Sequence, residues 1–297
     1  MSATAIRFQL GARTLLSIER RLQRVGLELD AVLAGQVPAL PPLAAADDGY
    51  LVTSLPIPLM RATRLQAPQL KCHVRQAYIR HHVDLTLGWD AYLARLSGNT
   101  RAAIRRKAKR WGAIDLRAYR TADELDAFHA LARQVSALTY QERLLDAGLP
   151  DDPAFRAGMR HAAAQDRVRA FLLFRDGEPA AYLYCPAEGD TLVYDRLGHD
   201  PALGDLSPGA VLQAEALRLL MDEARFARFD FTEGQGQHKS SFSTHGTPCC
   251  DLLLLRPTLG NRAMLAALER FDALMAAAKR ATALPALAPL TRRLRRA

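Results

Sequence analysis

Beyond residue 78, short apolar runs alternate with segments in which apolar residues recur every three or four positions. The apolar runs predict strands over residues 78–87, 114–119, 167–174, 179–185, 191–198, 228–232 and 251–255. The helical spacing predicts helices over residues 89–96, 101–111, 121–135, 153–165, 208–223 and 261–280, with a helical turn at 239–243. This order predicts a mixed α/β layer around one sheet.

Local signals support several of these boundaries. Thr121 followed by Glu124 is a capping-box pair at a helix start, and Asp152-Pro153 places proline at a first helical position. Asp176-Gly177 between two apolar runs predicts a tight hairpin turn.

The first 60 residues have a weaker pattern. Leu15, Ile18, Leu22 and Val25 fit one face of a basic helix over residues 14–29, which we therefore predict. The proline-rich stretch at residues 35–49 predicts a loop, because proline lacks a backbone donor and fixes φ.

Composition narrows the class of protein. The 297 residues are 49% hydrophobic and 24% charged, as in ordinary globular domains. No apolar run approaches the ~18 residues of a membrane span, and residues 1–15 lack a secretory signal, so we expect a soluble, cytoplasmic protein. The four cysteines form no C-x-x-C pair and the neighbouring histidines lack zinc spacing, so no metal is expected.

The net charge of +9 is concentrated in the predicted helix 101–111 and at the C-terminal end. Two interpretations stay open: a solvated basic face, or a surface that binds phosphate, nucleic acid or lipid headgroups. The cations concerned in the second interpretation are Arg101, Arg105, Arg106 and Lys109.

Three segments carry candidate chemistry. Ser207-Pro208-Gly209 opens a predicted helix, whose first amides (Ser207, Gly209, Ala210) suit a phosphate, although such a start also occurs without a ligand. The segment after the strand at 228–232 collects polar residues where α/β sheets place ligands, or else forms a solvated loop; these residues are Asp230, Glu233, His238 and Lys239. Asp195 and Arg196 interrupt an apolar strand, and alternation predicts that they point to opposite faces.

Residues 97–245 resemble the CelD-type acetyltransferase domain of the GNAT superfamily, which is related to FemAB-type peptidyltransferases. The resemblance rests on the order of several short features. The first is the basic helix with Thr100, Arg101, Arg105 and Arg106, and the second is a strand and loop with the pattern Tyr-x-x-x-x-Asp. The helix start at Ser207, the strand with Phe229 and Asp230, and the Gly-x-x-x-x-Lys spacing from Gly234 to Lys239 follow.

This resemblance implies an α/β fold with a GNAT-like mixed sheet, in which splayed central strands are flanked by helices. It places the acyltransferase domain at residues 96–256, after an N-terminal region at 1–95 and before a C-terminal helix and basic tail at 257–297. In a tandem arrangement, residues 1–95 would be a degenerate GNAT half.

The implied function is transfer of an acyl group from acyl-CoA, in practice acetyl-CoA, to an amine or hydroxyl of a saccharide or other cell-envelope precursor. The resemblance implies Asp195, Glu233 or His238 as base, Lys239 as the cation at the reaction centre, and Tyr140, Arg196 and Asp230 as substrate contacts. Ser207, Gly209 and Ala210 would hold the pyrophosphate.

Two alternatives stay open. FemAB relatives use aminoacyl-tRNA as donor, and the usual GNAT pyrophosphate loop (Q/R-x-x-G-x-G/A) is absent here. A non-catalytic protein could instead use its basic helix to bind nucleic acid or the inner face of an anionic membrane.

Overall fold

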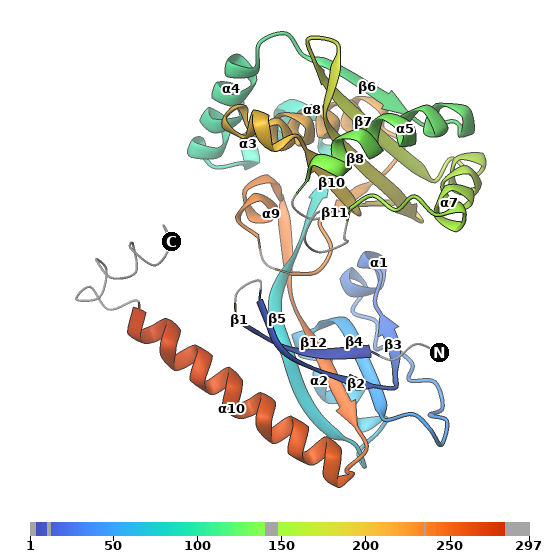
Figure 1. Ribbon diagram of the computed structural model, residues 1–297, viewed down its shortest axis with the longest axis vertical. Helices are drawn as coiled ribbons and strands as arrows, with labels where there is room; N and C mark the ends of the chain where they lie inside the picture. The colour runs from blue at the N-terminus through green and yellow to red at the C-terminus, as the bar shows by residue number, and fades with distance from the viewer. Residues whose placement is uncertain (1–3, 11–12, 140–147, 235, 283–297) are drawn as a thin grey trace. The chain divides into compact units, whose positions relative to one another are not determined.

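The computed structural model describes residues 4–10, 13–139, 148–234 and 236–282 (Figure 1). The chain divides into two compact units. Unit 1 comprises Met1–Leu27, Gly35–Ala77 and Cys250–Ala297, and unit 2 comprises Glu28–Ala34 and Tyr78–Cys249. Each unit therefore joins segments that are far apart in sequence, whereas the sequence predicted boundaries at 95 and 256, which stay a prediction.

Ten of the described strands form a mixed sheet in the order β3-β4-β12-β5-β11-β9-β8-β7-β6, with β10 paired to β8, and the first two strands form a separate sheet. Unit 2 holds β6 (Asp115–Tyr119), β7 (Val168–Arg175), β8 (Glu178–Glu188), β9 (Thr191–Val193), β10 (Arg196–His199) and β11 (Arg228–Asp230). Unit 1 holds β3 (Leu22–Gly26) and β4 (Gly49–Pro56), while β5 (Lys71–Asp84) and β12 (His245–Leu255) contribute residues to both units. The mixed α/β fold expected from the sequence is confirmed.

Alternation along the central strands of unit 2 creates a core on each face. Phe171 and Leu173 of β7 join one core, and Ala170, Leu172 and Phe174 join the other. Figure 1 shows the helices that cover the two faces. The first core includes α3 (Trp89–Arg95), α4 (Gly98–Trp111) and α8 (Pro208–Glu223), and the second includes α5 (Ala122–Leu138) and α7 (Pro153–Ala164).

The predicted local signals are present. Thr121 and Glu124 form a reciprocal capping box at the start of α5. Asp176 and Gly177 have φ values of 52° and 86° between β7 and β8, the left-handed conformation that a tight hairpin turn requires. Residues 35–48 contain no helix or strand, as the proline-rich composition predicts.

The predicted helix over residues 14–29 is wrong. Residues 13–20 form β2 (Arg13–Arg20), which pairs with β1 (Thr4–Leu10) so that Ile18 lies opposite Ile6. Leu16, Ile18 and Leu22 also satisfy a two-residue alternation, and pairing with β1 favours this strand period over the helical one. The last residue of the predicted segment, Leu29, begins the short helix α1 (Leu29–Leu33), which lies otherwise beyond it.

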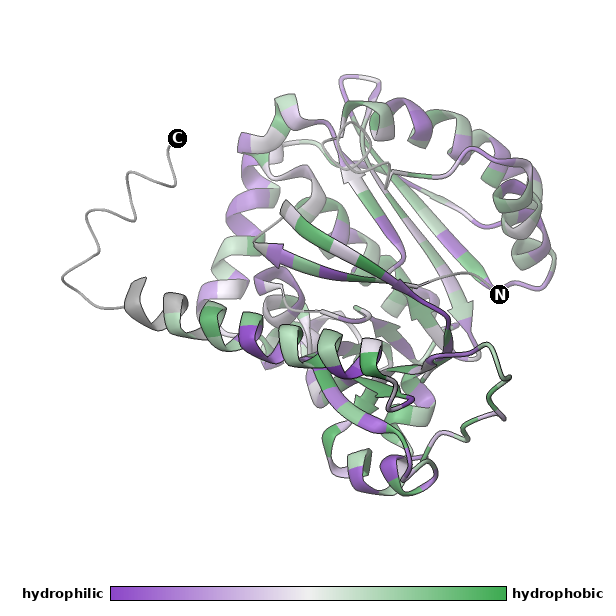
Figure 2. Cartoon of the chain, turned by 60° about the horizontal axis from the view of Figure 1, so that its bottom comes forward, coloured by the Kyte–Doolittle hydropathy of each residue, from purple (hydrophilic) through white to green (hydrophobic). Residues whose placement is uncertain are grey.

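Unit 1 has its own core, formed by the β1–β2 hairpin, β12 and α10 (Leu259–Thr282). Apolar and polar residues alternate along α10 (Figure 2). Met264, Leu265 and Leu268 of this helix pack against Leu253 and Leu255 of β12. Short helices complete the described structure: η1 (Ile57–Leu59), α2 (Met60–Leu65), η2 (Leu85–Leu87), η3 (Pro201–Leu206) and α9 (Gln237–Phe242).

Candidate active site

Two neighbouring strands of unit 2 part in the middle of the sheet. β9 pairs with β11 up to Val193 opposite Asp230, and the Tyr194 amide donates to the Asp230 carbonyl at 2.8 Å. Beyond this point β10 stays with β8, while the Phe231 amide donates to His81 of β5 at 3.0 Å. Within the described part of the chain, β10 has no pairing with β11. The single strand predicted over 191–198 is therefore two strands, separated at Tyr194 and Asp195.

A cavity of about 260 Å³ lies where the strands part. Its lining includes Asp195, Arg196, His238 and Lys239, which the sequence nominated from two separate segments. The other lining residues are Tyr182, Tyr194 and Leu197. The fold thus brings polar residues of the β9–β10 junction and of α9 to one small site.

Asp195 and Arg196 do not point to opposite faces as alternation predicted. Arg196 Nε lies 3.6 Å from Asp195 Oδ2, because Asp195 sits in the break between β9 and β10, where strand alternation no longer applies. Burial raises the pKa of Asp195, and the Arg196 charge partly offsets this. Arg196 Nε is itself buried with no hydrogen-bond partner in the structure.

His238 and Lys239 come from the first turns of α9. Lys239 Nζ donates to the Glu233 carbonyl at 2.5 Å, and burial lowers the pKa of Lys239 although Asp230 and Glu233 oppose this shift. Burial also lowers the pKa of His238, and the neighbouring Lys239 charge adds to the effect. The His238 ring lies 6.1 Å from the Tyr194 ring, centroid to centroid. A neutral imidazole and a partly desolvated ammonium therefore share the site.

Asp230 and Glu233 do not line this cavity. The Asp230 carboxylate is fully buried, where Arg80 holds it through Nη2 at 2.5 Å and Nε at 3.3 Å and the Thr232 amide donates to it at 2.9 Å. Glu233 has an exposed side chain, and its carbonyl holds Lys239. These two residues are placed to position the α9 segment, and their predicted direct roles remain predictions.

The start of α8 follows β10 and a short turn. Ser207 is the residue before the helix, but it has a left-handed φ of 56° and its side chain makes no capping hydrogen bond. The Ser207 amide donates to the Gly204 carbonyl and the Ala210 amide to the Ser207 carbonyl. Among the described residues, Gly209 is the position in this turn whose amide has no backbone acceptor. A Cβ at Gly209 would lie 3.1 Å from Leu197 Cδ2, so the helix start lies against β10.

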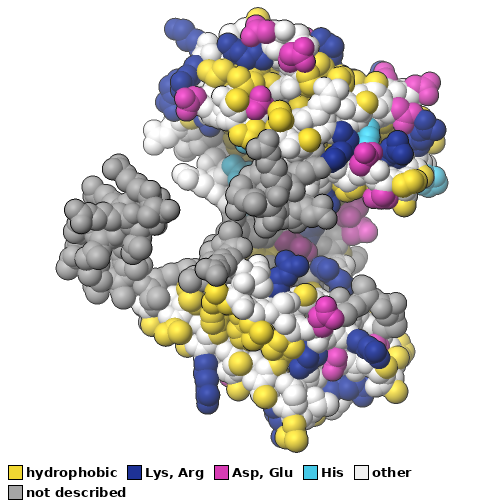
Figure 3. Space-filling model, in the orientation of Figure 1, with side chains coloured by type: hydrophobic (Ala, Val, Ile, Leu, Met, Phe, Trp, Pro, Cys, Tyr) yellow, Lys and Arg dark blue, Asp and Glu magenta, His cyan; other side chains and the backbone are white. Residues whose placement is uncertain are grey.

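Other nominated positions have different outcomes. Tyr140 lies outside the described residues. Arg101 donates to three carbonyls of the α3 segment, Leu93, Ala94 and Leu96, at 3.4, 3.3 and 2.6 Å. Arg105, Arg106 and Lys109 are exposed on α4, and the described residues give them no ion pair. Figure 3 shows Lys and Arg side chains gathered over this end of unit 2.

Sequence reasoning missed Arg80, Tyr182 and Tyr194 as members of the site. Tyr182 lies opposite Gly198 in the β8–β10 pairing, and a Cβ on Gly198 would clash with its ring. Arg80 lies in the predicted strand over residues 78–87. A cation in a strand needs a partner when it is buried, so its presence there could have indicated a buried ion pair.

Two searches of the described residues give negative results. No group of three or more His, Cys, Asp or Glu is arranged to hold a metal ion. No described helix combines the length and the apolar character that crossing a bilayer requires.

Comparison with known proteins identifies the region around the site. Residues 98–240 match the family model described as an acetyltransferase (GNAT) domain. The C-terminal domain (DUF2156) of a proposed lysylphosphatidylglycerol synthetase from Agrobacterium fabrum has 13% identity and a TM-score of 0.51, covering 76% of this chain and 72% of that one. A search of curated sequences finds no match.

Two further solved structures are similar at lower scores. L-PGS from Bacillus licheniformis has 14% identity and a TM-score of 0.48 over 73% of this chain and 71% of that one. FemX has 10% identity and a TM-score of 0.48 over 86% and 88%. At these identities the likeness concerns the fold alone. The family match of residues 98–240 and the mixed sheet with its flanking helices are together consistent with a GNAT-like fold.

Proposed function

We propose that this protein is an acyltransferase that moves an acyl group from acyl-CoA to an amine or hydroxyl of a saccharide or other cell-envelope precursor. The observation that carries the proposal is the cavity between the parted strands, where Asp195, His238 and Lys239 converge. The GNAT family match over the same residues indicates a transferase. The specific kinship with CelD-type domains belongs to the proposal.

The donor would lie with its acyl end in the cavity and its pyrophosphate near the start of α8. Support for the second contact is the Gly209 amide, together with the partial positive charge of a helix N-terminus. The residues nominated for this contact are Ser207, Gly209 and Ala210, although the amides of Ser207 and Ala210 already have backbone acceptors.

In the proposed reaction, the acceptor nitrogen or oxygen attacks the thioester carbonyl carbon. The proton of the acceptor passes to His238, which is neutral near pH 7 because its pKa is lowered, or to Asp195, whose raised pKa makes it a stronger base than an ordinary aspartate. Lys239 stabilises the negative oxygen that develops on the carbonyl. As the C–S bond breaks, the base that took the acceptor's proton returns it to the leaving thiolate, so that CoA departs as the thiol.

A ligand panel tests the donor first. Acetyl-CoA, longer acyl-CoA thioesters and CoA itself are titrated against the full chain, and binding to the folded state raises the melting temperature by mass action. The expected result is a rise with CoA thioesters that is weaker in Gly209→Val, whose side chain would crowd Leu197. The rise should be unchanged in Arg61→Gln, an exposed position that belongs to unit 1. No rise with any CoA thioester would remove acyl-CoA as donor.

A second donor, aminoacyl-tRNA, is favoured by one observation: the exposed and unpaired cations of α4. A polyanion that covers Arg105, Arg106 and Lys109 would relieve their mutual repulsion. Transfer assays with added aminoacyl-tRNA separate the two donors. RNase treatment should abolish transfer in the tRNA case and leave acyl-CoA-dependent transfer unchanged.

A further inference from the structure

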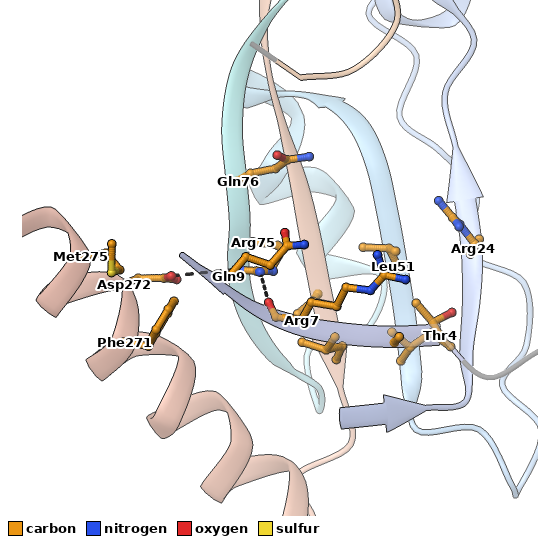
Figure 4. Close-up of a pocket in the computed structure, with 14 residues that line it drawn as sticks. Thr4, Arg7, Gln9, Arg24, Leu51, Arg75, Gln76, Phe271, Asp272 and Met275 are labelled. Atoms are coloured by element: carbon orange, nitrogen blue, oxygen red, sulfur yellow. Dashed lines mark hydrogen bonds and ion pairs between the residues drawn. The ribbon is translucent and has the colours of Figure 1, made fainter. Parts of the chain in front are cut away.

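A second and larger hollow lies within unit 1. It has a volume of about 940 Å³, near the upper end of the ~300–1,000 Å³ range of small-molecule sites. Figure 4 shows its labelled side chains coming from β1, β3, β4, β5 and α10 around one space. All of its lining residues belong to unit 1, whereas those of the candidate active site belong to unit 2.

One part of this hollow is apolar. Leu51 and Leu253 come from neighbouring strands of the sheet, and Phe271 and Met275 come from α10. Leu253 is buried in the core of unit 1, and Leu51 and Phe271 pack against that core. The hollow is therefore an extension of the hydrophobic core that stays open to a ligand, and aliphatic chains are the chemistry that such a surface binds.

The other part is cationic. Arg7, Arg24 and Arg75 line the hollow, and Asp272 is the acid among its described lining residues. Asp272 is shared between Arg75, at 3.9 Å, and His73, at 3.7 Å. The described residues offer no acid to Arg7 or Arg24, both of which are exposed.

The position of Arg24 on its strand makes this arrangement unusual. Arg24 follows the buried Leu22 by two residues on β3, so both side chains lie on the same face of the sheet. Because the Arg24 side chain is exposed and no described acid pairs with it, its guanidinium is available to the anionic group of a ligand in the hollow. Arg7 reaches the same hollow from β1, so two unpaired guanidinium groups from different strands stand at its edge.

We propose that this hollow binds an amphipathic anion, with a phosphate or carboxylate head on Arg7 and Arg24 and an alkyl chain against Leu51, Leu253, Phe271 and Met275. The site is independent of acyl transfer, and its test measures binding, so its failure would leave the proposed enzymatic function untouched.

The test uses isothermal titration of the full chain with dodecyl phosphate below its micelle concentration. One molecule should bind per chain, at least tenfold more tightly than either inorganic phosphate or the uncharged dodecyl maltoside. The double variant Arg7→Gln/Arg24→Gln should weaken binding at least tenfold, and both positions are exposed, so the fold should persist. Arg61→Gln, an exposed arginine of the same unit outside the hollow, is the matched control and should bind like the wild type.

A second variant tests the apolar part. Met275→Glu places a negative charge beside the alkyl chain at a half-buried position and should also weaken binding of dodecyl phosphate at least tenfold. Equal binding of dodecyl phosphate and dodecyl maltoside, or equal binding by wild type and the double arginine variant, would overturn the proposal.

Sedimentation with vesicles distinguishes the sources of the anion. Capture by phosphatidylglycerol but not phosphatidylcholine vesicles, lost in Arg7→Gln/Arg24→Gln, assigns a lipid headgroup with its chains. Binding of the monomeric alkyl phosphate without capture by vesicles assigns a free amphiphile. Vesicle capture that is unchanged in the double variant, together with no binding of the monomer, counts against the site.

Discussion

Lys239 is held in the candidate active site by a backbone carbonyl rather than by a carboxylate, since its ammonium donates to Glu233 O. It therefore keeps its net charge for a developing anion in the cavity. His238 beside it carries a lowered pKa, so the two neighbours supply a cation and a neutral base at the same pH. The segment that carries this pair is held in two ways: Lys239 donates to the Glu233 carbonyl, and Arg80 donates to the buried Asp230 carboxylate.

Lys239→Met should lower kcat by about 10²-fold or more, the cost of losing one donor to a developing oxyanion. KM for the donor should change less, because the charge acts mainly in the transition state. Steady-state kinetics check this, with Lys107→Met on α4 as the control for loss of one cation. An unchanged kcat in Lys239→Met would exclude the residue from the reaction centre.

The pH profile tests His238. Because its pKa is lowered below 6.5, the base is neutral at pH 7, and kcat/KM should fall only below pH 6.5 as the imidazole is protonated. His238→Gln should lower kcat/KM by about 10²-fold or more and remove this acidic limb. If the limb persists in His238→Gln, Asp195 is the base, and Asp195→Asn should remove it.

Gly198 has no side chain, and the structure leaves no room for one at this position. Its Cα faces the buried Tyr182 ring across the β8–β10 pair, with Tyr182 packed against Phe128. Gly198→Ala should destabilise the protein by about 1–3 kcal/mol through overpacking. Urea unfolding measures this, and Gly204→Ala, with open space around its Cα, should be near neutral.

The sequence nominated Asp195, Arg196, His238 and Lys239 because polar residues there interrupt or follow an apolar strand. The structure places all four on one cavity, and their roles stay predictions. The sequence did not nominate Arg80, whose partner Asp230 is 150 positions away. Such a pair depends on β5 lying beside β11, and strand adjacency is a property of the assembled sheet rather than of either segment.

At the scale of elements, a side chain of α4 caps the end of the preceding helix α3. Arg101 in the first turn of α4 donates to carbonyls at the end of α3, where orphan acceptors would otherwise lack partners. The basic helix, for which the sequence left open a solvated face or an anion-binding surface, thus contains one arginine with a structural role.

Arg101→Met should lower the free energy of unfolding by about 1–3 kcal/mol, as expected for loss of hydrogen bonds from a charged donor. Arg105→Met, four residues along the same helix and exposed, is the matched control and should change stability by less than about 0.5 kcal/mol. Equal effects of the two substitutions would show that Arg101 does not act as a cap.

Elements with strong local signals were predicted correctly, including α5 with its capping box and α8 with Pro208 at its first position. The segment 14–29 was predicted wrongly, because its apolar residues fit both the helical and the strand period. Pairing with β1 stabilises the strand. The break in the predicted strand 191–198 was not expected, because apolar residues flank it. β9 and β10 both pair with β8, and in the described structure β9 alone also pairs with β11.

At the scale of the whole molecule, the buried histidine His82 links stability to pH, because its burial favours the neutral imidazole. His82 is 6% exposed, its Nδ1 has no hydrogen-bond partner in the structure, and burial lowers its pKa to about 4. His245, which stacks on it with ring centroids 5.3 Å apart, adds to the lowering.

Stability should therefore fall as the pH drops. A histidine whose folded pKa is lowered takes up its proton preferentially in the unfolded state, so its contribution is present above pH 6.5 and is lost down to about pH 4. The loss attributable to His82 is up to about 3 kcal/mol. Urea unfolding from pH 7.5 to 4.5 measures it; His82→Gln should flatten the slope, and the exposed His161→Gln should leave it unchanged.

The division of the chain into units has a consequence for synthesis on the ribosome. Unit 2 has all of its residues once Cys249 has been added, whereas unit 1 also needs the rest of β12 and α10, which are translated after it. Since chains emerge from the N-terminus, unit 2 can fold while β3 and β4, made earlier, still lack the neighbouring strand β12. Strands made before unit 2 are thus enclosed after it, and a chain that stalls between Cys249 and β12's end would leave the apolar residues of β4 open to aggregation.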